Sequence, residues 1–382
     1  MKIAVWHDPY SPIVSGSVGG EDNLVELEIE LLRSIGHEVV PVMRSYKGVR
    51  RKAIHAMITA TGFGPSNVRE ILSQGVDLIH TNNMSIASGY SWMGDTDIPI
   101  VSSFHNYRPL CPISTAWRDG NLCFDCTDKS PYSAMKHRCG SSVGVLGSIR
   151  KSVFLRELVE IKRPRKVIFT STKMANAYLQ RVQDVNYEVL HNPSRLNPSC
   201  QEVDNYEEQA SGFLFAGRLT DEKGILQLLQ HWPKNESLTI AGKGELEARV
   251  KEICDRETNL NFIGTFSPND HEYYKRFEAL IFPSSWLEGS PLVVTEAISS
   301  GIPVIATNTS SAEELIQMSG CGLVINQSFS SEILKKSIEE VRRNRMTYKA
   351  RGIAAASNLF SPQVWIRKLE NIFLETLMDY GR

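Results

Sequence analysis

The stretch ALIFPSSWLEGSPLVVTEAISSGIPVIAT, residues 279–307, has the clearest fold pattern in the chain. Two short apolar runs, ALIF and PVIAT, flank a segment that starts at Pro291 and has the spacing of a helix up to Ser300. Proline is tolerated in the first turn of a helix, where its missing N–H has no partner to lose. A buried strand, a helix and another buried strand in this order predict a parallel sheet with helices on its faces.

The same alternation runs through the whole chain and predicts an α/β protein with two doubly wound parallel-sheet domains in tandem. One domain is expected over residues 1–195 and the other over 211–360, joined by a polar linker. The first helix has apolar residues at Leu24, Leu27, Leu31 and Ile35 and is expected to end at Gly36. A last helix within 361–382 has an apolar side, formed by Val364, Leu369, Ile372, Phe373 and Leu377.

Composition excludes several classes of protein. The 382 residues are 42% hydrophobic and 22% charged, which is typical of a folded chain, and the net charge of −1 argues against a dedicated nucleic-acid binder. No uncharged apolar run reaches the ~18 residues that span a bilayer. The chain opens without the features of a signal peptide, so a cytoplasmic location is expected.

Basic residues concentrate in the first half, which carries a net charge of +4 over residues 1–192 against −5 over 193–382. The two basic stretches, Arg44–Lys52 and Lys136–Lys173, interleave cations with apolar residues. That pattern suits either a solvated helix face or the anionic inner surface of a membrane, with the chain as a peripheral protein.

Two carboxylates in the opening stretch indicate a ligand that has hydroxyl groups. Glu288 lies in the loop before the expected helix, and Glu296 lies within it. The amides at Gly289, Ser290 and Leu292, together with the helix dipole, favour an anion. A nucleotide-diphosphate sugar has a diphosphate for the amides and sugar rings for the carboxylates.

A second loop supplies positive charge. GRLTDEKG, residues 217–224, follows the strand GFLFA directly, so Arg218 and Lys223 lie where a parallel sheet collects its ligands. Cations at that edge suit a diphosphate, and Gly217 allows close backbone approach.

Together these motifs resemble the retaining nucleotide-sugar glycosyltransferases of glycosyltransferase family four, whose hallmark is Glu, seven residues, Glu. The resemblance covers nearly the whole chain and includes Gly19-Gly20, SFHNY, VIFTST, VLHNP, AGRL…KG, AGKG and NFIG. It implies the GT-B architecture, in which two Rossmann-like domains face each other across a cleft. It also implies that the helix within 361–382 packs back onto the first domain.

The resemblance assigns roles residue by residue. Glu288 would bind hydroxyls of the donor sugar, and Glu296 would hold the ribose. Arg218 and Lys223 would neutralise the departing diphosphate in place of a catalytic metal, and His105 would lie beside the sugar. The remaining donor contacts, mostly from backbone groups, are expected at Gly19, Gly20, Gly217, Gly289, Ser290, Pro291, Leu292 and, near the base, Ile263.

The function implied is transfer of a hexosyl group, with retention, from a UDP- or GDP-linked sugar to a glycan or lipid-linked saccharide in cell-surface polysaccharide synthesis, such as that of lipopolysaccharide. Two alternatives stay open at this point. One is a sugar-nucleotide epimerase or hydrolase on the same fold. The other is a non-catalytic module that binds a sugar nucleotide or a nucleic acid.

A cysteine-rich insertion, residues 108–140, follows His105 closely. Its four cysteines have the spacing Cys, eleven residues, Cys, two, Cys, twelve, Cys. In a reducing compartment such a group indicates a structural zinc site more than a disulfide framework. Thiols without metal, an iron–sulfur cluster and a redox pair are the alternatives. The expected ligands are Cys111, Cys123, Cys126 and Cys139.

Overall fold

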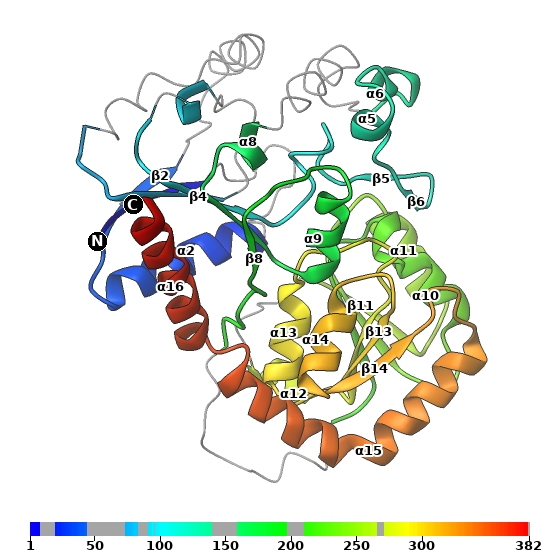
Figure 1. Ribbon diagram of the computed structural model, residues 1–382. Coiled ribbons are helices and arrows are strands. Elements are labelled where there is room, and N and C mark those ends of the chain that lie inside the picture. The colour runs from blue at the N-terminus through cyan, green and yellow to red at the C-terminus, as the bar shows by residue number, and fades with distance from the viewer. Residues whose placement is uncertain are drawn as a thin grey trace. The chain divides into compact units, whose positions relative to one another are not determined.

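The computed structural model describes residues 1–7, 20–43, 73–82, 91–94, 96–139, 159–196, 210–265 and 271–380 (Figure 1). The chain divides into two compact units, one of residues 1–118, 122–190 and 366–382 and the other of residues 119–121 and 191–365. Each unit contains a six-stranded sheet, and the paired strands in both sheets run parallel. Gly19, Arg44–Lys52 and the 140–158 part of the second basic stretch lie outside the described residues.

The sheet of the first unit has the strand order β2-β1-β3-β4-β7-β8. Its strands are β1 (Lys2–His7), β2 (Glu38–Met43), β3 (Leu78–Asn82), β4 (Ile100–Phe104), β7 (Lys166–Phe169) and β8 (Tyr187–Val189). The helices are α2 (Gly20–Ser34), the 3-10 helix η2 (Ser91–Gly94), α8 (Val159–Lys162) and α9 (Thr172–Leu179). The order reverses direction between β1 and β3, which makes this pair the topological switch point, where such sheets bind ligands.

Helix α2 forms where the sequence predicts a helix, and its buried face includes two acidic residues. The residues that are buried on it are Asp22, Leu24, Val25, Glu28, Ile29 and Leu32, whereas Leu27 and Leu31 are only partly buried. Leu24, one of the four apolar positions of the spacing, lies on the buried face, and Leu27, Leu31 and Ile35 lie beside it. Glu28 on that face is 1% exposed and accepts a hydrogen bond from His80 on β3, so the helix turns a charged residue toward the sheet.

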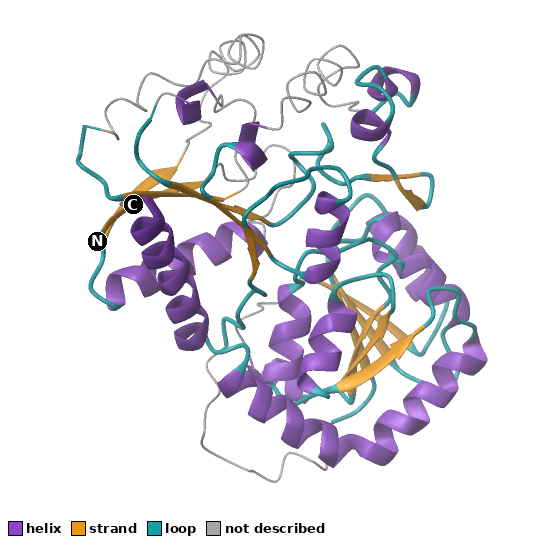
Figure 2. Cartoon of the chain, in the orientation of Figure 1, coloured by secondary structure: helices purple, strands orange, loops and turns teal. Residues whose placement is uncertain are grey.

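The second unit has the strand order β11-β10-β9-β12-β13-β14. Its strands are β9 (Phe213–Ala216), β10 (Leu238–Ala241), β11 (Leu260–Gly264), β12 (Ala279–Phe282), β13 (Val304–Thr307) and β14 (Gly322–Ile325). Its helices are η4 (Asp221–Lys223), α10 (Ile225–His231), α11 (Glu247–Cys254), α12 (His271–Lys275), α13 (Leu292–Ser299), α14 (Ala312–Ser319) and α15 (Ser331–Asn358). Figure 2 shows helices on both faces of this sheet, and every residue of β9, β12 and β13 is buried.

The last helix, α16 (Pro362–Tyr380), belongs to the first unit from residue 366 onward. Leu369, Ile372 and Phe373 are buried as predicted, and the Phe373 ring meets the His80 ring at 5.1 Å between centroids. Glu370 accepts a hydrogen bond from His37 at 2.8 Å. No helix among the described residues is long and apolar enough to cross a membrane.

The cysteine-rich segment forms a hairpin and two short helices. The hairpin pairs β5 (Trp117–Arg118) with β6 (Asn121–Leu122), and the helices are α5 (Asp125–Asp128) and α6 (Ser133–Lys136). Asp119 and Gly120 turn the hairpin with φ of 50° and 76°, a conformation that suits an Asp-Gly turn.

Candidate functional site

In the second unit the two loops singled out from the sequence lie at adjacent strands. The loop 217–224 leaves the carboxyl end of β9, and the loop 283–291 leaves that of β12, the pair at which the strand order reverses. The amide of Ser285 donates to the carbonyl of Glu222 at 3.0 Å, and the hydroxyl oxygen of Ser284 lies 3.3 Å from the same carbonyl oxygen. The structure thus brings both motifs together at a switch point, where doubly wound sheets bind ligands.

Lys223 and Glu288 form a buried ion pair at the centre of this region. The ammonium of Lys223 donates to Oε1 of Glu288, and the hydroxyl of Ser284 donates to the same oxygen at 2.8 Å. Glu288 is 5% exposed. Burial lowers the pKa of Lys223, while the charge of Glu288 opposes that effect. Two buried charges compensate each other here in a region where an unpaired charge would be costly.

Arg218 lies at the edge of the same cluster and is more open to solvent. Its guanidinium pairs with Glu222 at 3.1 Å, and 54% of its side chain is exposed. The ring of Trp286 has the Arg218 guanidinium 5.8 Å from its centroid and the Lys223 ammonium 5.1 Å from it. Two cations therefore flank one aromatic ring, one of them buried and the other exposed on the side where an anion could approach.

Glu296 lies inside α13 and is 1% exposed. The guanidinium of Arg195 donates to its Oε1 from Nε at 3.0 Å and from Nη2 at 2.7 Å, and the Tyr274 hydroxyl donates to its Oε2 at 2.9 Å. Burial raises the pKa of Glu296, and Arg195 and Tyr274 oppose the rise. Because a carboxylate offers about four acceptor positions, these three bonds leave about one for a ligand hydroxyl, on Oε2.

The residues before α13 are held by the start of the second unit. The amide of Asn192 donates to the Ser290 hydroxyl at 3.0 Å, and the Asn192 side chain donates to the Ser290 carbonyl at 2.8 Å. Pro291 stands just before the helix, and Leu292 is its first residue. The carbonyl and hydroxyl of Ser290 are thus engaged within the protein, and Gly289 and Ser290 are buried.

The surroundings of Gly217 and Gly224 differ in the space that they leave for a side chain. A Cβ on Gly217 would meet nothing closer than 3.9 Å, so the backbone there leaves room beside it. A Cβ on Gly224 would lie 2.2 Å from the carbonyl oxygen of Pro283, and Gly224 has a φ of +71°. Gly224 is therefore explained by packing between the two loops. Ile263 lies on the edge strand β11 and is 36% exposed.

The first unit has histidines on β1 and β3 and just after β4, and His7 and His80 among them are buried. His7 donates from Nε2 to Asp22 at 2.7 Å, and His80 donates from Nδ1 to Glu28 at 2.5 Å. Burial lowers the pKa of His7, but the bond to Asp22 and the charges of Glu21 and Asp22 outweigh it, so that the pKa is raised overall.

His105 follows β4 at the same edge and donates from Nε2 to the Asn82 side-chain oxygen at 2.9 Å. Burial lowers its pKa to about 4, so the ring is neutral near pH 7. A neutral imidazole offers an N–H donor without adding a charge. Gly20, the described member of the glycine pair, begins α2 and is exposed.

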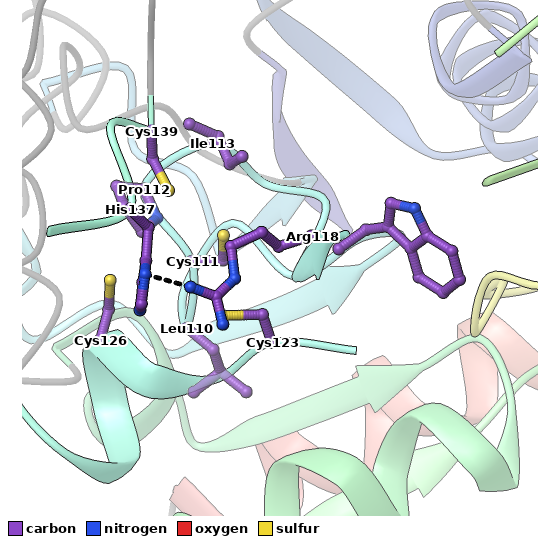
Figure 3. A pocket seen from close by; sticks show the side chains of 10 residues that line it. Leu110, Cys111, Pro112, Ile113, Arg118, Cys123, Cys126, His137 and Cys139 are labelled. Atoms are coloured by element: carbon purple, nitrogen blue, oxygen red, sulfur yellow. Dashed lines mark hydrogen bonds between the residues drawn. The ribbon is translucent and has the colours of Figure 1, made fainter. Parts of the chain in front are cut away.

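The cysteine-rich segment encloses a small cavity (Figure 3). The side chains that line it are Leu110, Cys111, Pro112, Ile113, Trp117, Arg118, Cys123, Cys126, His137 and Cys139. All four predicted metal ligands therefore face one cavity, and none of them forms a disulfide. Within the described residues, however, the ligand atoms that come within 4.8 Å of one another belong to Cys123, Asp125 and His137.

Several residues in these clusters are not among those that the sequence motifs predict. Arg195, Tyr274 and Asn192 reach the second-unit loops from far along the chain, and Asp125 and His137 join the cysteines. Asn192 and Arg195 end the VLHNPSR segment, which was a usable signal, whereas Tyr274 stands in a segment without a motif.

The fold of the chain is shared with solved structures. Two parallel-sheet Rossmann-like units make the GT-B α/β architecture, as predicted. The chain is similar to sucrose-phosphate synthase from Thermosynechococcus elongatus (TM-score 0.70, 16% identity, 99% of each chain covered). It is also similar to Anabaena Alr3699/HepE in complex with UDP (TM-score 0.61, 16% identity, 98% of this chain and 100% of that one).

Comparison of sequences finds a family match within the second unit. Residues 202–357 match the family described as glycosyl transferases group 1. The chain is 36% identical over 182 residues to the putative colanic acid biosynthesis glycosyl transferase WcaC of Escherichia coli, which is 42% of each chain. It is 26% identical over 182 residues to the lipopolysaccharide 1,2-N-acetylglucosaminetransferase of Salmonella typhimurium, or 42% of this chain and 46% of that one. The chain spans about half or less of the curated relatives it matches.

Proposed function

We propose that this protein is a glycosyltransferase that moves a hexosyl group, with retention, from a nucleotide-diphosphate sugar to a glycan or lipid-linked saccharide in cell-surface polysaccharide synthesis. The observation that carries the proposal is the Lys223–Glu288 pair with Arg218 beside it, at the β9–β12 switch point of the part that matches the group 1 family. A donor of this kind brings a diphosphate for the cations and hydroxyls for the acid.

The chemistry follows from these charges. Breaking the bond to the nucleotide makes an oxocarbenium-like sugar and puts negative charge on the departing diphosphate. Preorganised cations aimed at that charge are usually a large part of catalysis. Lys223 is held in place by Glu288 before the donor arrives, so it needs little reorganisation when the charge develops. Glu288 would then turn to the sugar hydroxyls, since the diphosphate replaces it as the partner of Lys223.

The nucleoside would be held by Glu296 and the segment around Ile263. Arg195 and Tyr274 orient the carboxylate of Glu296, which leaves Oε2 as the atom for a ribose hydroxyl. Alr3699/HepE was solved with UDP and with UDP-glucose, which supports testing uridine donors first and guanosine donors second. A departing phosphate oxygen would take the proton of the acceptor hydroxyl.

A donor-consumption assay tests the proposal and separates it from the alternatives. Nucleotide sugars are screened by thermal shift, and the best one is incubated with and without lipid-linked saccharide acceptors. A transferase releases nucleoside diphosphate rapidly only with an acceptor, and the product keeps the anomeric configuration of the donor. Equal release without acceptor would indicate a hydrolase, conversion to an isomeric donor an epimerase, and binding without turnover a binding module. Activity that persists in EDTA would support chemistry without a catalytic metal.

A further inference from the structure

The cavity of the cysteine-rich segment has the size of a single ion. Its free volume is about 10 Å³, close to that of one water-sized sphere. Cys111, Cys123, Cys126 and Cys139 approach it from separate parts of the segment, with His137 between them (Figure 3). The insertion thus folds with its thiols and one imidazole around a common centre.

His137 has the orientation of a metal ligand. Its Nε2 donates to Oδ2 of Asp125 at 2.9 Å, so Nδ1 carries the lone pair and faces the cavity. Histidines that bind metals commonly donate their other ring N–H to a carboxylate, which fixes the tautomer and the ring. The sulfur of Cys123 lies within the same 4.8 Å group.

A cation already lines this cavity. The Arg118 guanidinium donates to Nδ1 of His137, as the dashed line in Figure 3 shows, and Arg118 lines the cavity together with the cysteines. Its Nη2 lies 3.8 Å from Oδ2 of Asp125. One third of the Arg118 side chain is exposed, and it projects from a two-residue strand, so it can swing toward solvent.

We propose that the cavity binds one zinc ion through Nδ1 of His137, the thiolate of Cys123 and two further thiolates from Cys111, Cys126 and Cys139. Asp125 holds the far side of the imidazole. Three thiols lose their protons to solvent when zinc binds. One Zn²⁺ ion with three thiolates and a neutral imidazole has a net charge of −1. Arg118 then becomes the counter-ion at the rim of the cavity. The ion would link β5, α5 and α6 in the segment that follows His105 in the chain. This set differs from the four cysteines predicted from spacing, because it includes His137.

Metal analysis and X-ray absorption of the purified full chain test the site without any assay of activity. About one zinc per chain is expected, with three sulfurs at about 2.3 Å and one nitrogen at about 2.0–2.1 Å. Less than about a tenth of an equivalent after dialysis against zinc chloride would overturn the site. Four sulfurs and no nitrogen would overturn the role of His137.

Variants then test the ligands. Cys123→Ser and His137→Gln should lose zinc, and Asp125→Asn should weaken zinc affinity roughly 10–100-fold. Cys254→Ser, in α11, is the matched control and should keep the metal. Where a variant fails to fold, wild-type chain stripped with a chelator and titrated with zinc chloride should release about three protons per ion at neutral pH. Retention of zinc by Cys123→Ser, or zinc uptake without proton release, would overturn the proposal.

Discussion

Four charged side chains of the second unit are largely buried, and each of them is paired with a side chain of opposite charge. Lys223 is paired with Glu288, and Glu296 with Arg195. Burial disfavours every one of these charges alone, which explains why the pKa of Lys223 is lowered and that of Glu296 is raised. The pairs make the region ready for a ligand that offers both an anion and hydroxyls.

Lys223→Met should lower kcat roughly 10²–10³-fold, because the departing diphosphate loses a preorganised cation. The variant also leaves Glu288 buried without its partner, at a cost of roughly 3–5 kcal/mol in the free energy of unfolding. The double variant Lys223→Met/Glu288→Gln removes both charges and should recover most of that stability without recovering kcat. Kinetics and urea unfolding measure the two effects. Turnover of Lys223→Met within roughly threefold of wild type would contradict the proposed role.

Arg195→Met should weaken nucleoside-diphosphate binding about tenfold, as expected for the loss of a bond to a charged group that orients Glu296. Without Arg195 the pKa of Glu296 rises further, so the affinity should begin to fall at a higher pH than in wild type as the solution is acidified. Calorimetry with UDP and GDP across neutral to acidic pH measures this shift. Tyr274→Phe, which removes one neutral donor, is the control for a milder effect. Identical affinity and pH profile in Arg195→Met would exclude a role for Glu296 in nucleotide binding.

His105 makes stability fall on acidification. The folded ring has a pKa of about 4, against 6.5 in the unfolded chain, so the unfolded state binds more protons as the pH falls through this window. The contribution of His105 to the free energy of unfolding is complete above about pH 6.5. About 2 kcal/mol of that free energy should be lost between about pH 7 and pH 5. Urea unfolding of wild type and His105→Gln at both pH values isolates this effect from that of His7, which acts in the opposite direction. Equal losses in the two proteins would disprove the assignment.

At the level of secondary-structure elements, the strands can be predicted from the sequence more easily than the buried faces of the helices. Strands such as β9 and β12 are continuous apolar runs because both of their sides are buried. Helix α2 turns Glu28 inward, where His80 on β3 donates a hydrogen bond to its carboxylate, which a hydrophobic pattern cannot reveal. Helix α15 was not predicted at all, since much of its surface is polar and exposed.

Helix α16 should contribute a large part of the stability of the first unit. Phe373 is fully buried against His80, and Phe373→Ala should cost roughly 3–5 kcal/mol in the free energy of unfolding through the cavity it leaves. Leu374→Ala, at a neighbouring position that is 41% exposed, should change it by less than about 0.5 kcal/mol. Denaturant unfolding compares the two variants, and equal costs would show that α16 does not dock by this face.

At the scale of the whole molecule, charge is the property that separates the two halves of the chain. The first half is net positive and the second net negative, so an anionic membrane would attract one more than the other. Lys162, Arg163 and Arg165 are exposed in the first unit and available for such contact.

Replacing Lys162, Arg163 and Arg165 by glutamine should reduce co-sedimentation with phosphatidylglycerol vesicles severalfold, at about 1 kcal/mol for each cation near the surface. The matched control replaces Lys335, Lys336 and Arg343, which are exposed on α15 of the second unit. Both sets lower the net charge equally. Equal binding by the two variants and wild type would mean that the basic stretch is a solvated helix face.

The fold class and the two loops at the β9–β12 switch point could be predicted from local sequence. Strand burial and loop chemistry are local properties, written in runs of a few residues. Only the tertiary structure decided which side chains meet. Arg195 and Tyr274 reach Glu296, His137 and Asp125 join the cysteines, and α2 turns Glu28 inward. Each of these contacts joins residues far apart in the chain or on different elements, and it exists because a buried charge or ligand atom needs a partner that only packing can bring to it.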